Sequence, residues 1–410
     1  MKKSFTLFAG LFLAFSFNVM AADIPVDPAT TTLTDAYTSA ASGDVLILQD
    51  GTYVIDANIK MTKAITIKAQ NPKMAIIKGV GFEFNANSTG NVTIQDVVLD
   101  GTKAAGTFAG YVVDFTTVTG LIVNNVLFEN CTITNYGNCF LRANRLEGTC
   151  ESLKVNNCII KGNGSVSAYP FFQTTKTKFG TSLELTNSTI ADFSNEYIQN
   201  YTTTAGGNND ATYLFKNNTF YNTVTVAVRK PFSFTSGKVY VQNNIFVKST
   251  AVARTIDVTI NAAVSTAEFT NNVVNDFDAG ALLNSTGWSV ISGNLDVDPK
   301  FNNVATYDFT LPSGSALSAA NIGDPRWFGT VSGFTNTNIK TLSVYPNPTS
   351  DKIYFGKAVS KIEVISLLGK VLITQKNASE CSLATLPNGS YIVRIADNEG
   401  NIGQQKISKK

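Results

Sequence analysis

Basic residues in two similar contexts are the first candidates for chemistry in this sequence. Arg229 and Lys230 lie in "VAVRKPF", and Arg254 follows in "AVARTID". Guanidinium and ammonium groups bind anionic ligands, and a lysine or arginine with a lowered pKa can act as a general base. Arg229, Lys230 and Arg254 are therefore candidate catalytic residues. Solvated surface charge is the simpler alternative, and the sequence leaves both open.

Histidine is absent from all 410 residues. Its absence excludes Ser-His-Asp and Cys-His nucleophile systems, histidine-ligated metals and a histidine general base. No P-loop or Rossmann glycine pattern stands out either. Any catalysis must therefore use lysine, arginine, tyrosine or carboxylate side chains.

A stretch that combines acids and tyrosines, "IADFSNEYIQNY", is the best candidate for a metal or sugar site. Asp192 and Glu196 offer the oxygen ligands that Ca²⁺ prefers, so Ca²⁺ is the candidate cofactor. Tyr197 and Tyr201, together with Tyr169 in "SAYPFFQTT", offer aromatic faces on which sugar rings stack. Positions at turns or in the core are the alternative for these side chains.

The remaining charged residues carry a weaker signal. Arg142 and Arg145 form a second basic group in "FLRANRLEG", and Glu129, Glu147 and Asp257 are predicted to be ordinary surface residues. The formal net charge is +2 and 15% of residues are charged, so nothing indicates a nucleic-acid partner.

Repeated phrases indicate the scaffold that must position these residues. Seven phrases of eight residues are apolar at most first, third and eighth positions, and polar at the fifth. They begin at Val92, Val126, Leu153, Leu183, Tyr213, Val239 and Ala267. The fifth residues are Asp96, Asn130, Asn157, Asn187, Asn217, Asn243 and Asn271. The second phrase could instead begin at Leu121, but the later register aligns Cys131 with Cys158.

The fifth residue of each phrase is expected to turn a corner. Alternating apolar residues indicate a strand with one buried face, and asparagine tolerates the left-handed backbone of a sharp corner. Its amide would bond the amide of the next coil in a ladder, because a buried amide needs partners. The pattern predicts an all-β parallel β-helix of about nine coils between Val45 and about Phe301. Leucine-rich repeats, propellers and immunoglobulin-like sandwiches fit the period less well.

Four clustered cysteines, Cys131, Cys139, Cys150 and Cys158, precede a distant Cys381. An exported chain meets an oxidising compartment, where disulfides form. Four cysteines allow three sets of pairings, which the sequence does not decide. We favour Cys139–Cys150, which would close the loop between them, with free buried thiols as the alternative.

The N-terminus, "MKKSFTLFAGLFLAFSFNVMAAD", has the pattern of a secretory signal peptide over residues 1–21. Its apolar run is shorter than the ~20 residues of a membrane span, so a transmembrane anchor is the weaker alternative. We expect an exported chain with no membrane span after signal removal.

The phrases, with "DVDPKFNNVATYDFTL" and "IGDPRW", resemble the pectate-lyase-like superfamily of right-handed parallel β-helices. They look most like a Bacteroidetes family of exported proteins of unassigned function, related to chondroitinase-B-like and alginate-lyase-like proteins. Here "SGSALSAA" replaces the "GSPAI" expected after "DFTL". The prolines and aspartates of "DPKF" and "GDPRW" predict a C-terminal cap on the helix.

This resemblance implies a lateral groove that binds polysaccharide. Lyases of this kind neutralise a uronate carboxylate with Ca²⁺ or with lysine and arginine, and use a basic residue to remove a proton. The catalytic set of the family, including its histidine, cannot be placed in this sequence. We therefore expect a monomeric protein that binds polysaccharide, with a uronate lyase using Arg229, Lys230 and Arg254, or a structural adhesin, as alternatives.

The C-terminal 70 residues differ in pattern from the phrases. "YPNP", a Gly-Lys turn, "LPNGSYIVRI" and the terminal Lys409-Lys410 are similar to the type A sorting domain of the type IX secretion system. Short strands and turns predict a small β-sandwich. The expected domains are a β-helix over residues 22–330, a linker over 331–340 and the sorting domain over 341–410. The resemblance implies export through the type IX machinery, to the medium or the cell surface.

Overall fold

The chain folds into two compact units. A β-helix makes up most of the first unit, and the C-terminal domain makes up most of the second. The computed structural model describes residues 21–79, 81–87, 90–103, 106–116, 119–162, 169–193, 198–200, 210–223, 232–234, 236–247, 258–260, 264–275, 288–329, 344–366, 371–396 and 402–410. The expected linker and nearly all of the expected signal peptide lie outside these ranges. No helix among the described residues is long and apolar enough to cross a membrane.

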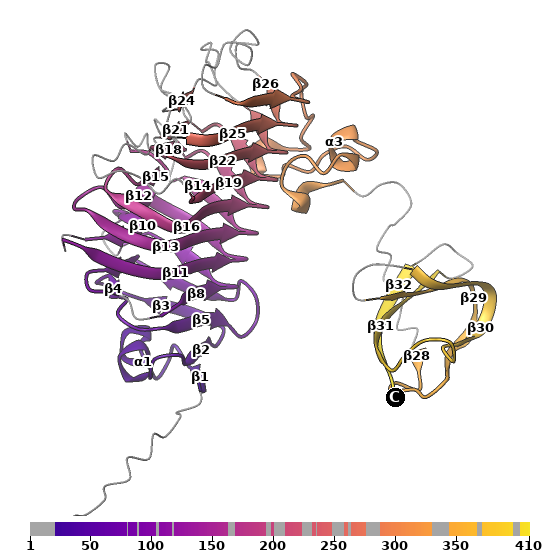
Figure 1. Ribbon diagram of the computed structural model, residues 1–410. Helices are drawn as coiled ribbons and strands as arrows, with labels where there is room; N and C mark the ends of the chain where they lie inside the picture. The colour runs from indigo at the N-terminus through magenta and orange to yellow at the C-terminus, as the bar shows by residue number, and fades with distance from the viewer. Residues whose placement is uncertain are drawn as a thin grey trace, which may run out of the picture. The chain divides into compact units, whose positions relative to one another are not determined.

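The β-helix is built of parallel strands that stack coil upon coil (Figure 1). Its first sheet has eleven strands. They are β1 (Asp23–Val26), β2 (Val45–Leu48), β5 (Ile65–Ala69), β8 (Val92–Gln95), β11 (Leu121–Glu129), β13 (Gly148–Asn156), β16 (Thr177–Thr186), β19 (Thr212–Lys216), β22 (Gly237–Gln242), β25 (Val264–Thr270) and β27 (Val290–Ser292). The β-helix has about six turns, which is somewhat fewer than the nine coils expected.

The second sheet has sixteen strands in two rows that share β12 (Thr132–Arg142). One row also contains β3 (Gly51–Val54), β6 (Ala75–Lys78), β9 (Val98–Asp100), β14 (Ile159–Gly162), β17 (Thr189–Ala191), β20 (Thr219–Tyr221), β23 (Ile245–Val247) and β26 (Val273–Asn275). The other contains β4 (Ile59–Lys60), β7 (Phe82–Phe84), β10 (Ala109–Phe115), β15 (Phe172–Gln173), β18 (Gln199–Asn200), β21 (Phe232–Phe234) and β24 (Val258–Ile260). A short helix, α1 (Leu33–Ser39), lies between β1 and β2.

The register of the first sheet confirms the alignment of the phrases. Val126 pairs with both Val92 and Leu153, so the later of the two registers is the observed one. The starts of the remaining phrases pair in the same way. The apolar positions point inward and form one continuous core. Aromatic rings pack edge to face along it, with Phe128 and Phe140 5.2 Å apart and Phe215 and Phe232 5.0 Å apart between centroids.

The fifth residue of every phrase has a left-handed backbone, with φ between 50° and 62°. Its side chain is partly buried in six of the phrases and exposed at Asn271, and the bonds between neighbouring corners are uneven. Asn217 donates to Asn187 at 3.2 Å, whereas Asn187 donates to the side chain of Asn156 and not to that of Asn157. The corner turns the chain, and the fully buried ladder belongs to the next residue.

That inner ladder consists of the sixth residue of successive phrases, each with no solvent exposure. It contains Cys131, Cys158, Ser188, Asn218, Asn244 and Asn272. The Oδ1 atom of Asn244 accepts bonds from the backbone N–H and Nδ2 of Asn218, both at 3.0 Å. Its own Nδ2 donates to the carbonyl of Phe215 at 2.8 Å and to Oδ1 of Asn272 at 2.9 Å. Each amide thus satisfies backbone and side-chain groups of neighbouring coils.

Residues 322–327, which we name the clasp, do not cap the end of the β-helix as expected. They lie against its side, where Asp324 forms hydrogen bonds with Thr189 of β17 and Thr219 of β20. Figure 1 shows the neighbouring α3 at the side of the coils. Gly323 N–H donates to the corner carbonyl of Asn243 at 2.8 Å, and Arg326 Nη2 donates to that of Asn157 at 2.7 Å. Left-handed corners turn carbonyls away from the sheet ladder, so a lateral segment that supplies donors satisfies them. Three short helices, η1 (Val304–Thr306), α3 (Ala316–Ala319) and η2 (Pro325–Trp327), belong to this region.

Asp324 is the buried centre of the clasp and makes stability depend on pH. It is 1% exposed, accepts from Thr189 Oγ1 at 2.7 Å and pairs with Arg326 Nη1 at 2.8 Å. Burial raises its pKa from the ordinary 3.8 to about 6. The folded chain therefore holds this proton more tightly than the unfolded chain, so the free energy of unfolding should fall as pH rises from about 3.8 to about 6, and level off above.

Chemical denaturation across this pH range measures the effect. Asp324→Asn should remove the fall, because asparagine has no proton to lose. At lower pH, Asp44 has the opposite effect on the free energy of unfolding, which should rise with pH there, because backbone hydrogen bonds from Ala22 and Ala41 lower the pKa of Asp44. If the free energy of unfolding of Asp324→Asn fell with pH as steeply as that of the unaltered protein, the titrating group would be a residue other than Asp324.

The C-terminal domain is one curved antiparallel sheet and not the two-sheet sandwich expected. Its strands are β28 (Val344–Tyr345), β29 (Lys352–Ser366), β30 (Val371–Ser382), β31 (Gly389–Ala396) and β32 (Ile402–Lys409). The long β29 pairs with β28, β30 and β31, and its pairing with β30 is irregular between Tyr354 and Val359. That bend wraps a single sheet around one core.

The motifs at the two ends of this domain contact each other. Asn347 of "YPNP" donates to the carbonyl of Lys406 and accepts from the N–H of Ser408, both at 2.9 Å. Lys409 is buried, and its ammonium donates to the carbonyl of Leu383 at 2.8 Å. The basic C-terminus is therefore part of the fold.

The favoured disulfide between Cys139 and Cys150 is wrong, because both are free, buried thiols. Cys139 lies on β12 and Cys150 on β13, which belong to different sheets. The two side chains therefore enter the core from different sheets. All five cysteines are free in the structure.

Candidate functional site

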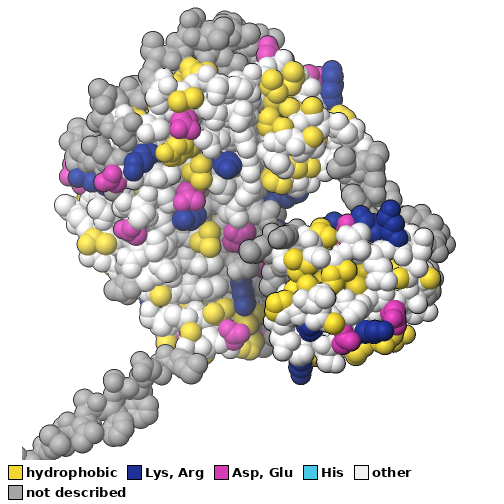
Figure 2. Space-filling model, turned by 45° about the vertical axis from the view of Figure 1, so that its right-hand side comes forward, with side chains coloured by type: hydrophobic (Ala, Val, Ile, Leu, Met, Phe, Trp, Pro, Cys, Tyr) yellow, Lys and Arg dark blue, Asp and Glu magenta, His cyan; other side chains and the backbone are white. Residues whose placement is uncertain are grey.

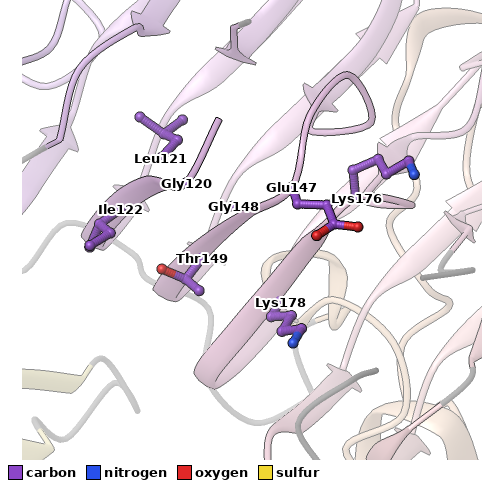
Figure 3. A pocket seen from close by; sticks show the side chains of 8 residues that line it. All are labelled: Gly120, Leu121, Ile122, Glu147, Gly148, Thr149, Lys176 and Lys178. Carbon is purple, nitrogen blue, oxygen red and sulfur yellow. The ribbon is translucent and has the colours of Figure 1, made fainter. Parts of the chain in front are cut away.

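The first sheet carries a groove on its outer face, where β11, β13 and β16 begin. Ile122, Thr149 and Lys178 occupy equivalent positions of these three strands, because Thr149 pairs with both of the others. The alternation of each strand sends the following residue, such as Cys150 or Phe179, into the core. Figure 3 shows Ile122, Thr149 and Lys178 as a row across three neighbouring coils.

A second row lies just before the strands begin. Gly120, Glu147 and Lys176 precede residues that pair with one another. Backbone bonds fix this row, because Gly120 N–H donates to the carbonyl of Glu147 at 2.9 Å and Gly148 N–H donates to that of Lys176 at 3.1 Å. The positions of Glu147 and Lys176 therefore follow from the stacking of the coils.

The two rows enclose a cavity of about 330 Å³. Its lining consists of Gly120, Leu121, Ile122, Glu147, Gly148, Thr149, Lys176 and Lys178 (Figure 3). A second hollow of about 320 Å³ continues along the strands, past Asn124, Glu151 and Gly180. The carboxylate at the end of the flexible Glu151 side chain lies over Gly180.

The groove combines apolar, hydroxyl and charged groups. Ile122 is 50% exposed, which is high for a large aliphatic side chain in a sheet. Thr149 adds a hydroxyl, Glu147 adds a carboxylate, and Lys176 and Lys178 add ammonium groups. Such a surface can contact the apolar face of a ring, accept bonds from hydroxyl groups and attract an anion. Figure 2 shows charged side chains scattered among uncharged ones on one face of the molecule.

Most candidate residues from the sequence fall outside the described ranges. Arg229, Lys230 and Arg254 lie there, and so do Glu196, Tyr197 and Tyr201. Tyr169 is described and is 41% exposed, but it does not line the groove. The structure therefore does not bring the predicted catalytic and sugar-binding residues together within its described part.

Asp192 lies at a second corner of the β-helix, between β17 and β18. Its backbone is left-handed, with φ of 51°, and its Oδ1 accepts from Asn222 Nδ2 at 2.6 Å. Burial, with a hydrogen bond to Asp192, raises the pKa of Tyr307 to about 12. Asp192 thus binds neighbouring side chains. Among the described residues, no group of three or more histidine, cysteine or carboxylate side chains could hold a metal ion.

Arg142, from the second basic group, is held inside the fold. Its Nε donates to Asp114 Oδ1 at 2.6 Å, and its guanidinium lies 3.8 Å from the centre of the Tyr111 ring. The side chain of Arg142 is 14% exposed and that of Asp114 is 6% exposed. This pair joins β10 to β12 and leaves the guanidinium little surface for a ligand.

The groove could not be recognised from the phrases, because it lies at the start of strands whose first residues precede the phrases. Glu147 was expected to be ordinary surface, and Thr149, Lys176 and Lys178 were not considered. β13 begins at Gly148 and β16 at Thr177, well before the phrases at Leu153 and Leu183. The alternation in "GTCES" and "TKFGTS" is the signal that could have extended both strands.

Two family models match parts of the chain. A domain of unknown function (DUF4957) matches residues 51–193, and a secretion system C-terminal sorting domain matches residues 343–410. The first match covers the groove, and the second covers the curved sheet. No curated protein matches the chain by sequence.

Solved structures of polysaccharide lyases are similar to the chain at low identity. A PL6 family alginate lyase, AlyGC, is 19% identical with a TM-score of 0.43, and the match covers 68% of this chain and 40% of the lyase. A PL6 alginate lyase in complex with a trisaccharide is 12% identical with a TM-score of 0.31, covering 62% and 60%. The PL6 family polysaccharide lyase Pedsa3628 from Pseudopedobacter saltans is 12% identical with a TM-score of 0.22, covering 73% and 98%. The chain thus spans less than half the length of AlyGC.

The parallel coils and the matched C-terminal domain together identify the fold of the protein and its route of export. The sorting domain indicates transport by the type IX secretion system, whose machinery is therefore a partner. The chain is a parallel β-helix protein with a C-terminal sorting domain of the type IX secretion system, which directs it to the medium or to the cell surface.

Proposed function

We propose that this exported protein binds a polysaccharide in the groove over β11, β13 and β16. The observation that carries the proposal is the construction of the groove from equivalent positions of three successive coils. Neighbouring strands lie about 4.8 Å apart, so the surface presents side chains from successive coils at regular intervals. A polymer of sugars has the same kind of regularity, and a repeated surface can contact successive units of it.

The chemistry of the lining suits a sugar ring. The exposed side chain of Ile122 can lie against the apolar face of a ring. Thr149 and Glu147 can bond hydroxyl groups, and the two lysines can pair with an acidic substituent. In this proposal residues 1–21 are a signal peptide, residues 22–330 form the binding domain and residues 341–410 direct secretion. The binding domain acts as a monomer.

Affinity electrophoresis of the purified protein tests this function. Gels containing alginate, chondroitin, pectin or heparin should retard the protein if it binds one of these glycans, and gels without glycan serve as the control. Ile122→Asp should abolish the retardation, because a carboxylate would replace the apolar contact. Unchanged migration in all four gels would reject the proposal for these glycans.

The same samples separate binding from cleavage. A lyase leaves an unsaturated sugar at each cut, which absorbs ultraviolet light. Retardation with constant absorbance indicates a binding protein. Rising absorbance would assign a lyase, and Arg229→Ala, Lys230→Ala and Arg254→Ala would then identify its catalytic residues.

A further inference from the structure

We infer that the type IX machinery contacts the outer face of the sorting domain through an apolar row of side chains flanked by lysines. The row consists of Val371, Ile365 and Ile392, which lie side by side on β30, β29 and β31. Lys376 and Lys406 flank it. The partner that fits this face is a protein surface of the machinery with apolar side chains and neighbouring carboxylates. The inference is independent of the glycan groove.

Strand alternation places the row on the outer face of the sheet. Val364 pairs with Val393, and both lie in the core of the domain. The adjacent pair, Ile365 and Ile392, therefore points away from that core. On its other side Ile365 pairs with Val371, which extends the row to β30. The core of the domain thus forms without these three side chains.

The row is accessible at its β30 end. Val371 is 45% exposed and the neighbouring Leu372 is 37% exposed, whereas Ile365 is 5% exposed. Among the described strands, β30 pairs with β29 alone, so the row ends at an edge of the sheet. Large aliphatic side chains at an exposed edge are typical of a surface that another protein covers.

Lysine side chains border the row on two strands. Lys406 of β32 pairs with Ile392. Lys376 of β30 pairs with Lys361, which lies on the same face of β29 as Ile365. Both Lys376 and Lys406 are exposed. The apolar row therefore has ammonium groups beside it and not only at a distance.

The charge of this face is predominantly positive. Glu363 pairs with Lys361 at 2.6 Å and with Arg394 at 3.5 Å. Within the described part of the domain, no ion pair includes Lys376 or Lys406. Residues 341–410 contain nine lysines and arginines against five acids, a formal charge of +4, whereas the whole chain carries +2. A basic rim around an apolar centre is complementary to apolar side chains flanked by carboxylates.

The motifs that identify the domain leave recognition to other side chains. Asn347 and Lys409 form hydrogen bonds within the domain. Tyr345 and Tyr354 are exposed, and their rings stack 6.2 Å apart. Next to them Lys352 pairs with Glu380 at 2.9 Å, so the charges there are balanced. This tyrosine pair lacks a net positive rim, and its surroundings supply the control positions.

Photocrosslinking in the bacterium that exports this protein tests the contact directly. The full-length chain carries a photoreactive phenylalanine analogue in place of Val371 or, as the control, in place of Tyr354. Illumination should join position 371, and not position 354, to a protein component of the type IX machinery, identified by mass spectrometry. An adduct with lipid, with lipopolysaccharide or with another part of the same chain would overturn the inference. Equal labelling from both positions, or none from position 371, would also overturn it.

Export of variants measures how much the contact contributes. Val371→Asp should lower the ratio of exported to retained protein about tenfold, because it places a carboxylate in an apolar contact. Lys376→Ala with Lys406→Ala should lower it about fivefold, as expected for two exposed ion pairs. Tyr354→Ser and Lys352→Ala are the matched controls and should leave the ratio unchanged.

Thermal melting of each purified full-length variant checks that it is folded. If Val371→Asp melts early, the crosslink and the double lysine variant decide the question. Export of folded Val371→Asp and of the double lysine variant at the unaltered level would overturn the inference. An equal loss of export in the two control variants would assign recognition to the tyrosine pair instead. Glycan binding is measured separately, so neither result changes the standing of the proposed function.

Discussion

Asn244→Ala should lower the free energy of unfolding of the β-helix by about 4 kcal/mol, because each buried polar group left without a partner costs about 1–3 kcal/mol. The substitution removes the acceptor of the Asn218 amide groups and the donor to the carbonyl of Phe215. Asn244 is fully buried, so water does not replace these bonds without opening the core. The loss should also loosen the stacking of neighbouring coils.

Denaturant titration followed by circular dichroism measures this effect. Asn243→Gly is the matched control, since it is the adjacent residue and glycine adopts the left-handed φ of 56° without strain. The control should change stability by less than about 1 kcal/mol. Equal destabilisation by both variants would mean that the corner, and not the inner ladder, holds the coils together.

Arg326→Ala should lower the free energy of unfolding by about 3–5 kcal/mol, the range for removing one partner of a buried ion pair. The guanidinium pairs with Asp324 at 2.8 Å and donates to the carbonyl and side-chain oxygen of Asn157 at 2.7 and 2.6 Å. Without it, a carboxylate that is 1% exposed is left in the clasp without its positive partner. The effect should be largest above pH 6, where Asp324 is charged.

Two further variants test this explanation. Adding Asp324→Asn to Arg326→Ala should recover part of the stability, because it removes the unpaired charge. Arg394→Ala removes an exposed arginine that pairs with Glu363 at 3.5 Å, and should cost no more than about 1 kcal/mol. If the double variant is no more stable than Arg326→Ala, the guanidinium stabilises the fold through its hydrogen bonds to the corner residue Asn157 and not through its pairing with Asp324.

Much of the fold could be predicted because its rules are local. Alternating apolar residues identify a buried strand face, and an asparagine such as Asn217 marks a left-handed corner. Both features depend on a few adjacent residues, so each phrase carries them independently. The observed pairing of Tyr213 with Leu183 and Val239 confirms that the phrases define the register.

Other features of the fold depend on partners distant in sequence. The sequence does not show whether Asn217 or Asn218 forms the buried ladder. The left-handed corner at Asn217 decides this, because it turns the side chain of Asn218 inward. The clasp was expected at the end of the helix, because nothing in "GDPRW" shows that Arg326 reaches Asn157. Cys139 and Cys150 are close in sequence, yet the turn between them places them on different sheets.

The candidate site could be predicted least. Arg229 and Arg254 are basic residues in similar sequence contexts, and both lie outside the described ranges. Lys178 and Glu147 form no motif with their neighbours in sequence. Their relation becomes visible only when β11, β13 and β16 are placed side by side.

The sequence by itself determined the β-helix, its register and the secretion domain, since repeated phrases and short motifs encode them in adjacent residues. Tertiary structure decided where an uncharged, a negative and a positive coil meet to form a groove, because stacking joins residues that lie a whole coil apart. It also decided that the clasp binds the side of the helix, and that Lys409 is buried in the sorting domain. Such contacts depend on which surfaces face each other after folding, and spacing along the chain does not encode that directly.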